Sequence, residues 1–205
     1  MEALTMPLRD ELAFKAVAAA LGDADDVLRN AGRWKSVGRW KWWQSSQAVG
    51  VAAAGTLIPG VWVVAAPASV VFTYRKMAHV AWAIGQGMSV PVEPVTDILL
   101  ITGLWTGAVA EDDLKAVRAA FGRIDLDALR SAGAAEDAAV TRSLLEQAVP
   151  GLLGLLGIKL AAYVVGEAGA SMAPVIGAGI AGGAAAASVE AFAGQTRRYY
   201  ACKGG

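Results

Sequence analysis

The feature that most constrains this chain is a long uncharged run that a helix breaker divides near its middle. No charged side chain occurs from Gln44 to Tyr74, and Pro59-Gly60 interrupts the run. Each arm, as a helix of about 14 residues, reaches about 21 Å, which is short of the roughly 30 Å hydrocarbon core of a bilayer. The pattern therefore predicts two apolar helices folded back on each other instead of one straight span.

The charges that flank this run have the same sign. Basic residues precede it in the segment 33–41 and follow it at Arg75 and Lys76. Positive residues favour the cytoplasmic side of a membrane, so both ends of the run would lie on that side. This favours a re-entrant or shallow hairpin over a crossing.

The segment Ala31–Trp43 interleaves cationic and tryptophan side chains. Indole rings prefer the headgroup level of a bilayer, and each Lys or Arg near an anionic leaflet adds roughly 1 kcal/mol of attraction. We therefore expect a membrane interface made of this segment and of the basic residues that follow the two apolar regions: Arg33, Trp34, Lys35, Arg39, Trp40, Lys41, Trp42, Trp43, Arg75, Lys76, Arg197 and Arg198. Two alternatives remain open. The tryptophans could pack at the edge of a core while the cations extend to water, or the segment could bind single-stranded nucleic acid.

A second apolar region begins at Pro150 and is rich in glycine and alanine. Small residues at helical spacings let helix backbones approach closely. The expected helix-packing positions are Gly151, Gly154, Gly157, Gly177, Gly179 and Gly183. Ile58–Gly60 and Ala173–Gly177 mark similar central turns in the two regions, which indicates a loose internal repeat. We therefore predict an all-α helical bundle with two Gly/Ala-rich hydrophobic helical hairpins.

A length of 205 residues fits one domain. We predict a single helical domain, 1–205, with an amphipathic helix (Leu8–Leu21) and the Trp/basic segment in 1–43, the first hairpin region in 44–110, charged helices in 111–147 and the second hairpin region in 148–205. Mixed charges on a helical period are typical of a solvated layer, so 111–147 is expected to face water. Its expected buried residues are Phe121, Ile124, Leu126, Leu129, Leu144 and Leu145.

No motif in the sequence carries chemistry. His79 is the only histidine and Cys202 the only cysteine, so we expect no internal disulfide and no cysteine-based metal cluster. No nucleophile and base are paired by a motif, and the glycine-rich region lacks the lysine of a phosphate-binding loop. Glu93 and Asp97 fit acids that meet the macrodipole at a helix N-terminus. The sequence thus predicts no catalytic residues, no metal and no cofactor.

The stretches Gly55–Val90 and Ile158–Tyr200 resemble the EcsC family of bacterial membrane-associated proteins. The first has an apolar IPG turn, an apolar helix, an Arg/Lys-Met step and an isoleucine-glycine exit. The second is similar to the family's proline-valine-glycine turn, glycine-alanine helix and basic-aromatic end. The resemblance implies a helical, membrane-associated protein with no family catalytic residues to carry over.

These observations predict a non-enzymatic membrane-associated protein, a scaffold or an accessory or regulatory component on the cytoplasmic side of the cell membrane. Glu2, Asp10 and Glu11 interrupt any signal-peptide core, which supports that location. The expected partners are anionic lipid headgroups and either a second copy of the chain or a membrane protein. A formal net charge of +0 argues against nucleic acid as a partner. The alternatives are a soluble oligomeric assembly, which could hold an apolar ligand between helices, and a pore former that inserts on activation.

Overall fold

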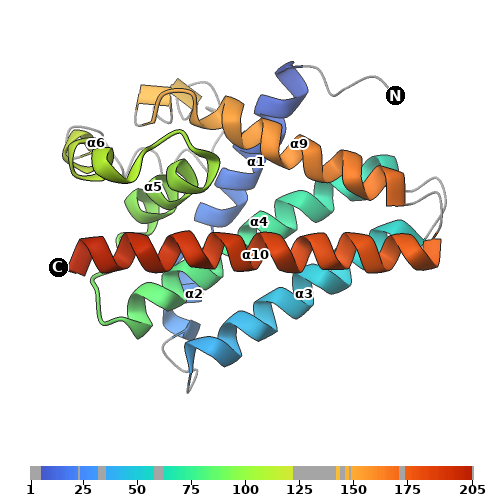
Figure 1. Cartoon of the computed structure of the whole chain (residues 1–205), viewed down its shortest axis with the longest axis horizontal. Helices are drawn as coiled ribbons and strands as arrows, with labels where there is room; N and C mark the ends of the chain where they lie inside the picture. Colours follow the sequence, from blue (N-terminus) through green and yellow to red (C-terminus); the bar gives the residue numbers. More distant parts are fainter. Residues whose placement is uncertain are drawn as a thin grey trace.

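The computed structural model is all-α in the part of the chain that it describes, with eight α-helices, one short 3-10 helix and no strand, which confirms the predicted fold class (Figure 1). The described residues are 6–22, 24–31, 36–57, 62–121, 142–143, 146–147, 149–170 and 174–204. In chain order the elements are α1 (Met6–Leu21), α2 (Ala24–Ala31), α3 (Val37–Leu57), α4 (Trp62–Gly87), α5 (Pro94–Thr106), η1 (Glu111–Asp113), α6 (Leu114–Phe121), α9 (Leu152–Ala170) and α10 (Pro174–Gly204).

The core lies around α5 and the C-terminal half of α4. Every residue from Val95 to Leu104 in α5 is buried, and so is every residue from Met77 to Ile84 in α4. A helix that is apolar on all sides must be surrounded by other elements, because no polar face is left for water. The side chains around these two segments form one continuous cluster to which α1, α2, α3, α6, α9 and α10 also contribute.

The longest helix, α10, crosses the whole molecule (Figure 1). Its 31 residues correspond to about 46 Å at the helical rise of 1.5 Å. It packs most extensively against α3, and also against α4, α9 and α5. Its last turns reach the start of α5, where Tyr199 contacts Asp97. The end of the chain is therefore attached to the first turn of the central helix.

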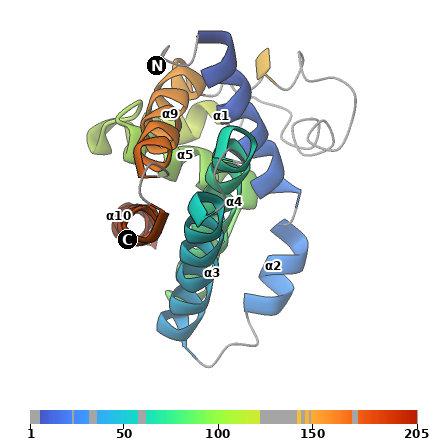
Figure 2. The same ribbon diagram turned by 90° about the vertical axis from the view of Figure 1, so that its right-hand side faces the viewer.

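Helices α3 and α4 lie side by side (Figure 2). The expected break at Pro59-Gly60 lies outside the described residues, with Leu57 ending α3 before it and Trp62 beginning α4 after it. Although a proline removes one backbone donor from a helix, α4 continues through Pro67. Within the described ranges, no helix combines the length and the mean hydropathy that crossing a bilayer requires.

The glycines expected to pack helices take different places. Gly157 lies against α1, where an added Cβ would come within 2.7 Å of the Arg9 carbonyl oxygen. Gly151 does not lie on a helix as expected. It precedes α9 with a φ of 73°, a value that favours glycine. An added Cβ at Gly154 or Gly183 would meet nothing within 4 Å in the described part of the chain.

Another glycine of the same run makes the contact with α3 instead. An added Cβ at Gly182 would lie 3.0 Å from a methyl carbon of Val49. Gly177 and Gly179 belong to α10, but their surroundings lie outside the described side chains. The sequence shows that small residues recur, and the rotation of each helix decides which of them face a neighbour.

Little of the charged region falls within the described residues. Phe121 is buried at the end of α6, as expected. The other residues expected to be buried there lie outside the described part of the chain: Ile124, Leu126, Leu129, Leu144 and Leu145.

Candidate functional site

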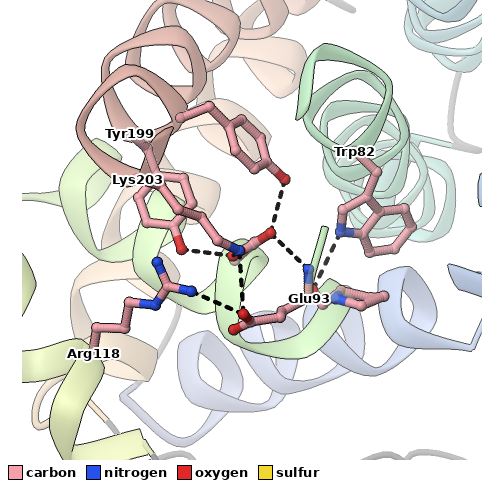
Figure 3. A network of polar contacts seen from close by, with 8 residues as sticks. Trp82, Glu93, Arg118, Tyr199 and Lys203 are labelled. Carbon is pink, nitrogen blue, oxygen red and sulfur yellow. Dashed lines mark hydrogen bonds and ion pairs between the residues drawn. The ribbon is translucent and has the colours of Figure 1, made fainter. Parts of the chain in front are cut away.

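The fully buried carboxylate of Asp97 is the centre of a network of polar contacts, which Figure 3 shows from close by. Asp97 lies in the first turn of α5 among apolar residues. Tyr199 and Lys203 of α10 donate hydrogen bonds to it, and Figure 3 shows these two residues close to Glu93. We call this group the Asp97 cluster. Its side-chain partners from α10 lie about a hundred residues away in the sequence.

Both oxygens of this carboxylate are fully used. Oδ1 accepts a hydrogen bond from the Tyr199 hydroxyl at 2.6 Å and one from the Lys203 ammonium at 2.7 Å. Oδ2 accepts one from the Tyr200 hydroxyl at 3.0 Å and one from the Glu93 backbone N–H at 2.9 Å. A carboxylate has about four acceptor positions, and four donors occupy them here.

Two further charged residues, Glu93 and Arg118, lie beside the buried ion pair of Asp97 and Lys203. The Glu93 carboxylate lies 3.6 Å from the Lys203 ammonium and accepts a hydrogen bond from Arg118 at 2.8 Å. The Trp82 indole donates to the carbonyl of Pro94 at 3.2 Å, which fixes the start of α5 against α4. Lys203 thus faces two carboxylates while its side chain is only 4% exposed.

The two tyrosines act only as donors. Burial raises the pKa of Tyr199 and of Tyr200 above the ordinary tyrosine value, and the Asp97 carboxylate beside them raises it further. Both phenols therefore stay protonated well into alkaline pH. With no free acceptor position and no exposed atom on the carboxylate, the Asp97 cluster is a structural device that joins α10 to α5.

The sequence-based interpretation of Asp97 was incomplete. Its bond to the Glu93 N–H is the expected interaction of an acid at a helix N-terminus. The bonds to α10 were not foreseen. Two signals were present: an ionisable residue inside the apolar stretch 95–105, and Tyr199 and Lys203 at a spacing of four, which places them on one helix face.

A second polar site is a cleft of about 260 Å³ between α2, α3 and α4, called here the α2–α3–α4 cleft. Its lining residues are Asp26, Val27, Asn30, Trp40, Trp43, Gln44, Gln47, Arg75, Lys76 and His79. The four from α3 follow the helical spacing of three and four and so lie on one face of that helix. The cleft joins four of the residues expected at a membrane interface: Trp40, Trp43, Arg75 and Lys76.

The tryptophans of the Trp/basic segment separate into core and surface. Trp40 is buried, and its indole donates to the carbonyl of His79 at 3.1 Å. Trp42 is 66% exposed and Trp43 is 43% exposed. The core-edge alternative therefore describes Trp40, whereas the other two indoles present apolar rings to solvent.

The remaining basic residues of the expected interface lie at several places. Arg39 is exposed near the start of α3, and Lys41 pairs with Glu190 of α10 at 2.6 Å. Arg197 is exposed on α10, and Arg198 pairs with Glu111 at 3.3 Å. Three members of the set lie outside the described residues: Arg33, Trp34 and Lys35.

The α2–α3–α4 cleft differs from the Asp97 cluster in its hydrogen bonding. The amide oxygens Oε1 of Gln44 and Gln47 are buried and have no hydrogen-bond partner. Gln44 is only 3% exposed. A buried acceptor without a hydrogen-bond partner costs about 1–3 kcal/mol of stability. Both glutamines line the cleft, but their Oε1 atoms are enclosed by protein atoms and do not face its open space.

Another cavity, of about 160 Å³, lies between α4, α5, α9 and α10. Thr73 lines it with a buried hydroxyl that has no hydrogen-bond partner. Lys159 also lines it, donates to the carbonyl of Trp105 and lies 4.6 Å from the centre of the Trp105 ring. Burial lowers the pKa of Lys159. Within the described residues, no group of three His, Cys, Asp or Glu side chains is placed to hold a metal ion.

Comparisons with known proteins return no match: no family model, no curated protein and no solved structure is significantly similar to this chain. The case for a function therefore depends on the residues and on their geometry.

Proposed function

We propose that this protein is a non-enzymatic, membrane-associated helical protein that binds an anionic surface on the cytoplasmic side, as a scaffold or an accessory or regulatory component. The observation that supports this best is the exposure of two adjacent indoles, Trp42 (66%) and Trp43 (43%), beside the exposed Arg39. Water is a poor environment for such rings, and the headgroup region of a bilayer is a favourable one.

The cations near these indoles supply the electrostatic part of the proposal. Arg75 and Lys76 line the same cleft as Trp43. Cations close to an anionic leaflet attract it over a screening length of about 10 Å at 0.1 M salt and about 3 Å at 1 M. Binding through this face should therefore weaken as salt is added.

The two hydrophobic hairpins are part of the same proposal. We infer that α3 with α4, and α9 with α10, form the two hydrophobic hairpins expected from the sequence. Because residues 77–84 of α4 are buried in the core, the described state would bind through its Trp surface first. Insertion of a hairpin would require the bundle to open. The resemblance to the EcsC family agrees with a membrane role and stays a prediction.

Flotation with vesicles tests the proposal. We expect the wild type to float with phosphatidylcholine vesicles that contain an anionic lipid, less in 1 M salt, and little with phosphatidylcholine alone. Replacing both Trp42 and Trp43 by alanine should weaken partitioning by about tenfold or more, since two exposed rings no longer leave water. Carbonate extraction of the floated protein then reports whether a hairpin has inserted.

A matched control is available on α9. Leu155 and Ile158 are 38% and 52% exposed, so their double replacement by alanine removes comparable exposed apolar surface from another face. This control should float like the wild type. If it loses binding as strongly as the tryptophan variant, the proposed face is wrong. If the wild type floats with no vesicle at low salt, membrane association itself is wrong.

The exposed apolar residues of α9 favour one alternative, a soluble oligomer. Leu8 is 54% exposed, and the next residue, Arg9, places its backbone against Gly157 of α9, near Ile158. An exposed apolar surface of this kind would suit a second copy of the chain. A defined oligomer that is lost in the Leu155 and Ile158 double variant, and that ignores vesicles, would favour this function. Leakage of trapped dye would instead indicate the pore former.

A further inference from the structure

The cavity between α4, α5, α9 and α10, called here the α4–α9 cavity, has the size of one small ring. Its volume is about 160 Å³, and an apolar cavity of about 150 Å³ takes up benzene. The described residues that line it are Val70, Thr73, Tyr74, Met77, Trp105, Lys159, Leu160, Ala162 and Ser188. A single aromatic ring therefore fits this space, whereas a long acyl chain does not.

The inner wall of the α4–α9 cavity is apolar. Val70, Met77 and Leu160 are buried. The Tyr74 hydroxyl is already used in a hydrogen bond to α5, and the Thr73 hydroxyl is enclosed by protein atoms and does not serve a ligand. A thioether makes favourable contacts with aromatic rings. This wall therefore favours an apolar ring over a polar group.

The cavity opens to solvent at α9. Lys159 and Ala162 line it, and both are exposed. They are three positions apart in a helix, so they lie on the same face. A ligand that enters between α9 and α4 would thus have its ring against the buried wall and its substituent at this opening.

Lys159 places a positive charge at the opening. Its ammonium donates to the carbonyl of Trp105 and lies 4.6 Å from the centre of the Trp105 ring. Both partners are uncharged, and within the described ranges no carboxylate pairs with Lys159. An ammonium has three N–H donors, so a carboxylate on a ligand could accept one while the bond to Trp105 stays.

The charge on Lys159 is also incompletely solvated. Burial lowers its pKa, because the charged form has lost part of its water. An anion at the opening would offset this loss. The same lysine would therefore favour a carboxylate over a neutral polar group on the same ring.

We propose that the α4–α9 cavity binds a small aromatic carboxylate, with the ring against the apolar wall and the carboxylate at the Lys159 ammonium. The inference goes beyond the proposed membrane function and does not depend on it. None of the described residues that line the cavity belongs to α3, the helix of Trp42 and Trp43.

Calorimetric titration of the whole chain with benzoate, benzamide and acetate tests the class of ligand. Benzamide has the ring and nearly the shape of benzoate without the charge, and acetate has the carboxylate without the ring. We expect benzoate to bind about fivefold more tightly than benzamide, as one partly exposed charge pair allows, and acetate to bind more weakly than either. Equal affinities for benzoate and benzamide would overturn the carboxylate assignment. Acetate as tight as benzoate, or no saturable binding of benzoate, would overturn the site.

Lys159→Met removes the charge and keeps the length of the side chain. Its affinity for benzoate should fall about fivefold, to that of benzamide, while benzamide should bind as it does to the wild type. The control is Lys15→Met on α1, an exposed lysine that pairs with Glu11 at 3.3 Å and does not line the cavity. This control should keep the preference for benzoate. If it loses the preference as Lys159→Met does, the placement of the carboxylate at Lys159 is wrong.

Ala162→Leu tests the location of the ring. A larger side chain at this exposed position narrows the opening without changing the core, so benzoate and benzamide should both bind about tenfold more weakly. Ala191→Leu changes an exposed alanine of α10 that does not line the cavity, and it should bind both ligands as the wild type does. Thermal unfolding shows that each variant is folded. Unchanged affinities in Ala162→Leu would place the ligand elsewhere and overturn the inference.

Discussion

The ammonium nitrogen of Lys203 lies 2.7 Å from an oxygen of Asp97, and the two side chains are 4% and 0% exposed. These residues join the last turn of α10 to the first turn of α5. Lys203→Met would leave a buried carboxylate without its counter-ion, although three neutral donors would remain. We expect the free energy of unfolding to fall by about 3 kcal/mol, measured by urea denaturation followed through tryptophan fluorescence.

The control for this variant is Arg198→Met on the same helix. Arg198 pairs with Glu111 at 3.3 Å, but both side chains are more than half exposed. An exposed ion pair contributes about 0–1 kcal/mol, so this variant should change stability by about 0.5 kcal/mol or less. Equal losses in the two variants would mean that burial of the Asp97 pair adds nothing to its strength.

The buried tyrosines predict a loss of stability at alkaline pH. The pKa values of Tyr199 and Tyr200 are raised in the folded protein, first by burial and then by Asp97. Above about pH 10 the unfolded chain ionises its tyrosines while the folded chain keeps these protons. The unfolded state then binds fewer protons, and the free energy of unfolding falls by up to about 1.4 kcal/mol per pH unit for each tyrosine.

Tyr200→Phe removes one of these groups. Its stability at pH 8 should be lower than that of the wild type, because Asp97 loses a donor. Above about pH 10 its free energy of unfolding should fall less steeply with pH, because one fewer tyrosine is protonated in the folded state and ionised in the unfolded state. Unfolding in urea across pH 8–12, with tyrosinate absorbance as a second signal, measures both effects. An unchanged slope would show that Tyr200 ionises as readily in the folded state as in the unfolded chain.

A close contact between Gly85 and Tyr200 allows a test of packing. An added Cβ at Gly85 would lie 2.4 Å from the Tyr200 ring carbon Cζ. Gly85→Ala should destabilise the protein by about 1–3 kcal/mol, because the ring must move away from Asp97. Gly183→Ala, at an exposed position of α10, should instead stabilise it by about 0.5–1 kcal/mol through helix propensity. A Gly183→Ala variant as unstable as Gly85→Ala would place Gly183 at a helix contact after all.

The unpaired hydroxyl of Thr73 predicts a stabilising substitution. Thr73 is 3% exposed, and its hydroxyl has no partner. Thr73→Val keeps the β-branched shape of the side chain but removes the buried polar atom, so stability should rise by about 1 kcal/mol. Ser188, which lines the same cavity, provides a comparison through Ser188→Ala. Destabilisation by Thr73→Val would show that the hydroxyl is hydrogen-bonded in solution.

Several elements follow directly from local patterns in the sequence. The amphipathic stretch 8–21 corresponds to α1 (Met6–Leu21), and the apolar stretch 95–109 corresponds to α5, which ends before Gly107 in the left-handed conformation. Periodicity indicates a helix, and Pro or Gly near its ends indicates where it begins or stops. These signals are local, so the sequence alone is sufficient for them.

The two sites were only partly predictable. The composition of 31–43 indicated cations and indoles at one place, but not that Trp40 would be buried while Trp42 remained exposed. That difference depends on the rotation of α3 against α4. The glutamines Gln44 and Gln47 belong to no motif, and only the packing of α3 against α2 and α4 places them in one cleft with Arg75.

The sequence by itself determined that this chain is helical and that cations and indoles gather beside the first apolar region. These properties depend on residues close together in the chain. Only the tertiary structure decided that Asp97 meets Lys203, and that the α3 glutamines share a cleft with Arg75. Such contacts depend on how separate helices rotate and cross, and that packing is set by the whole core at once.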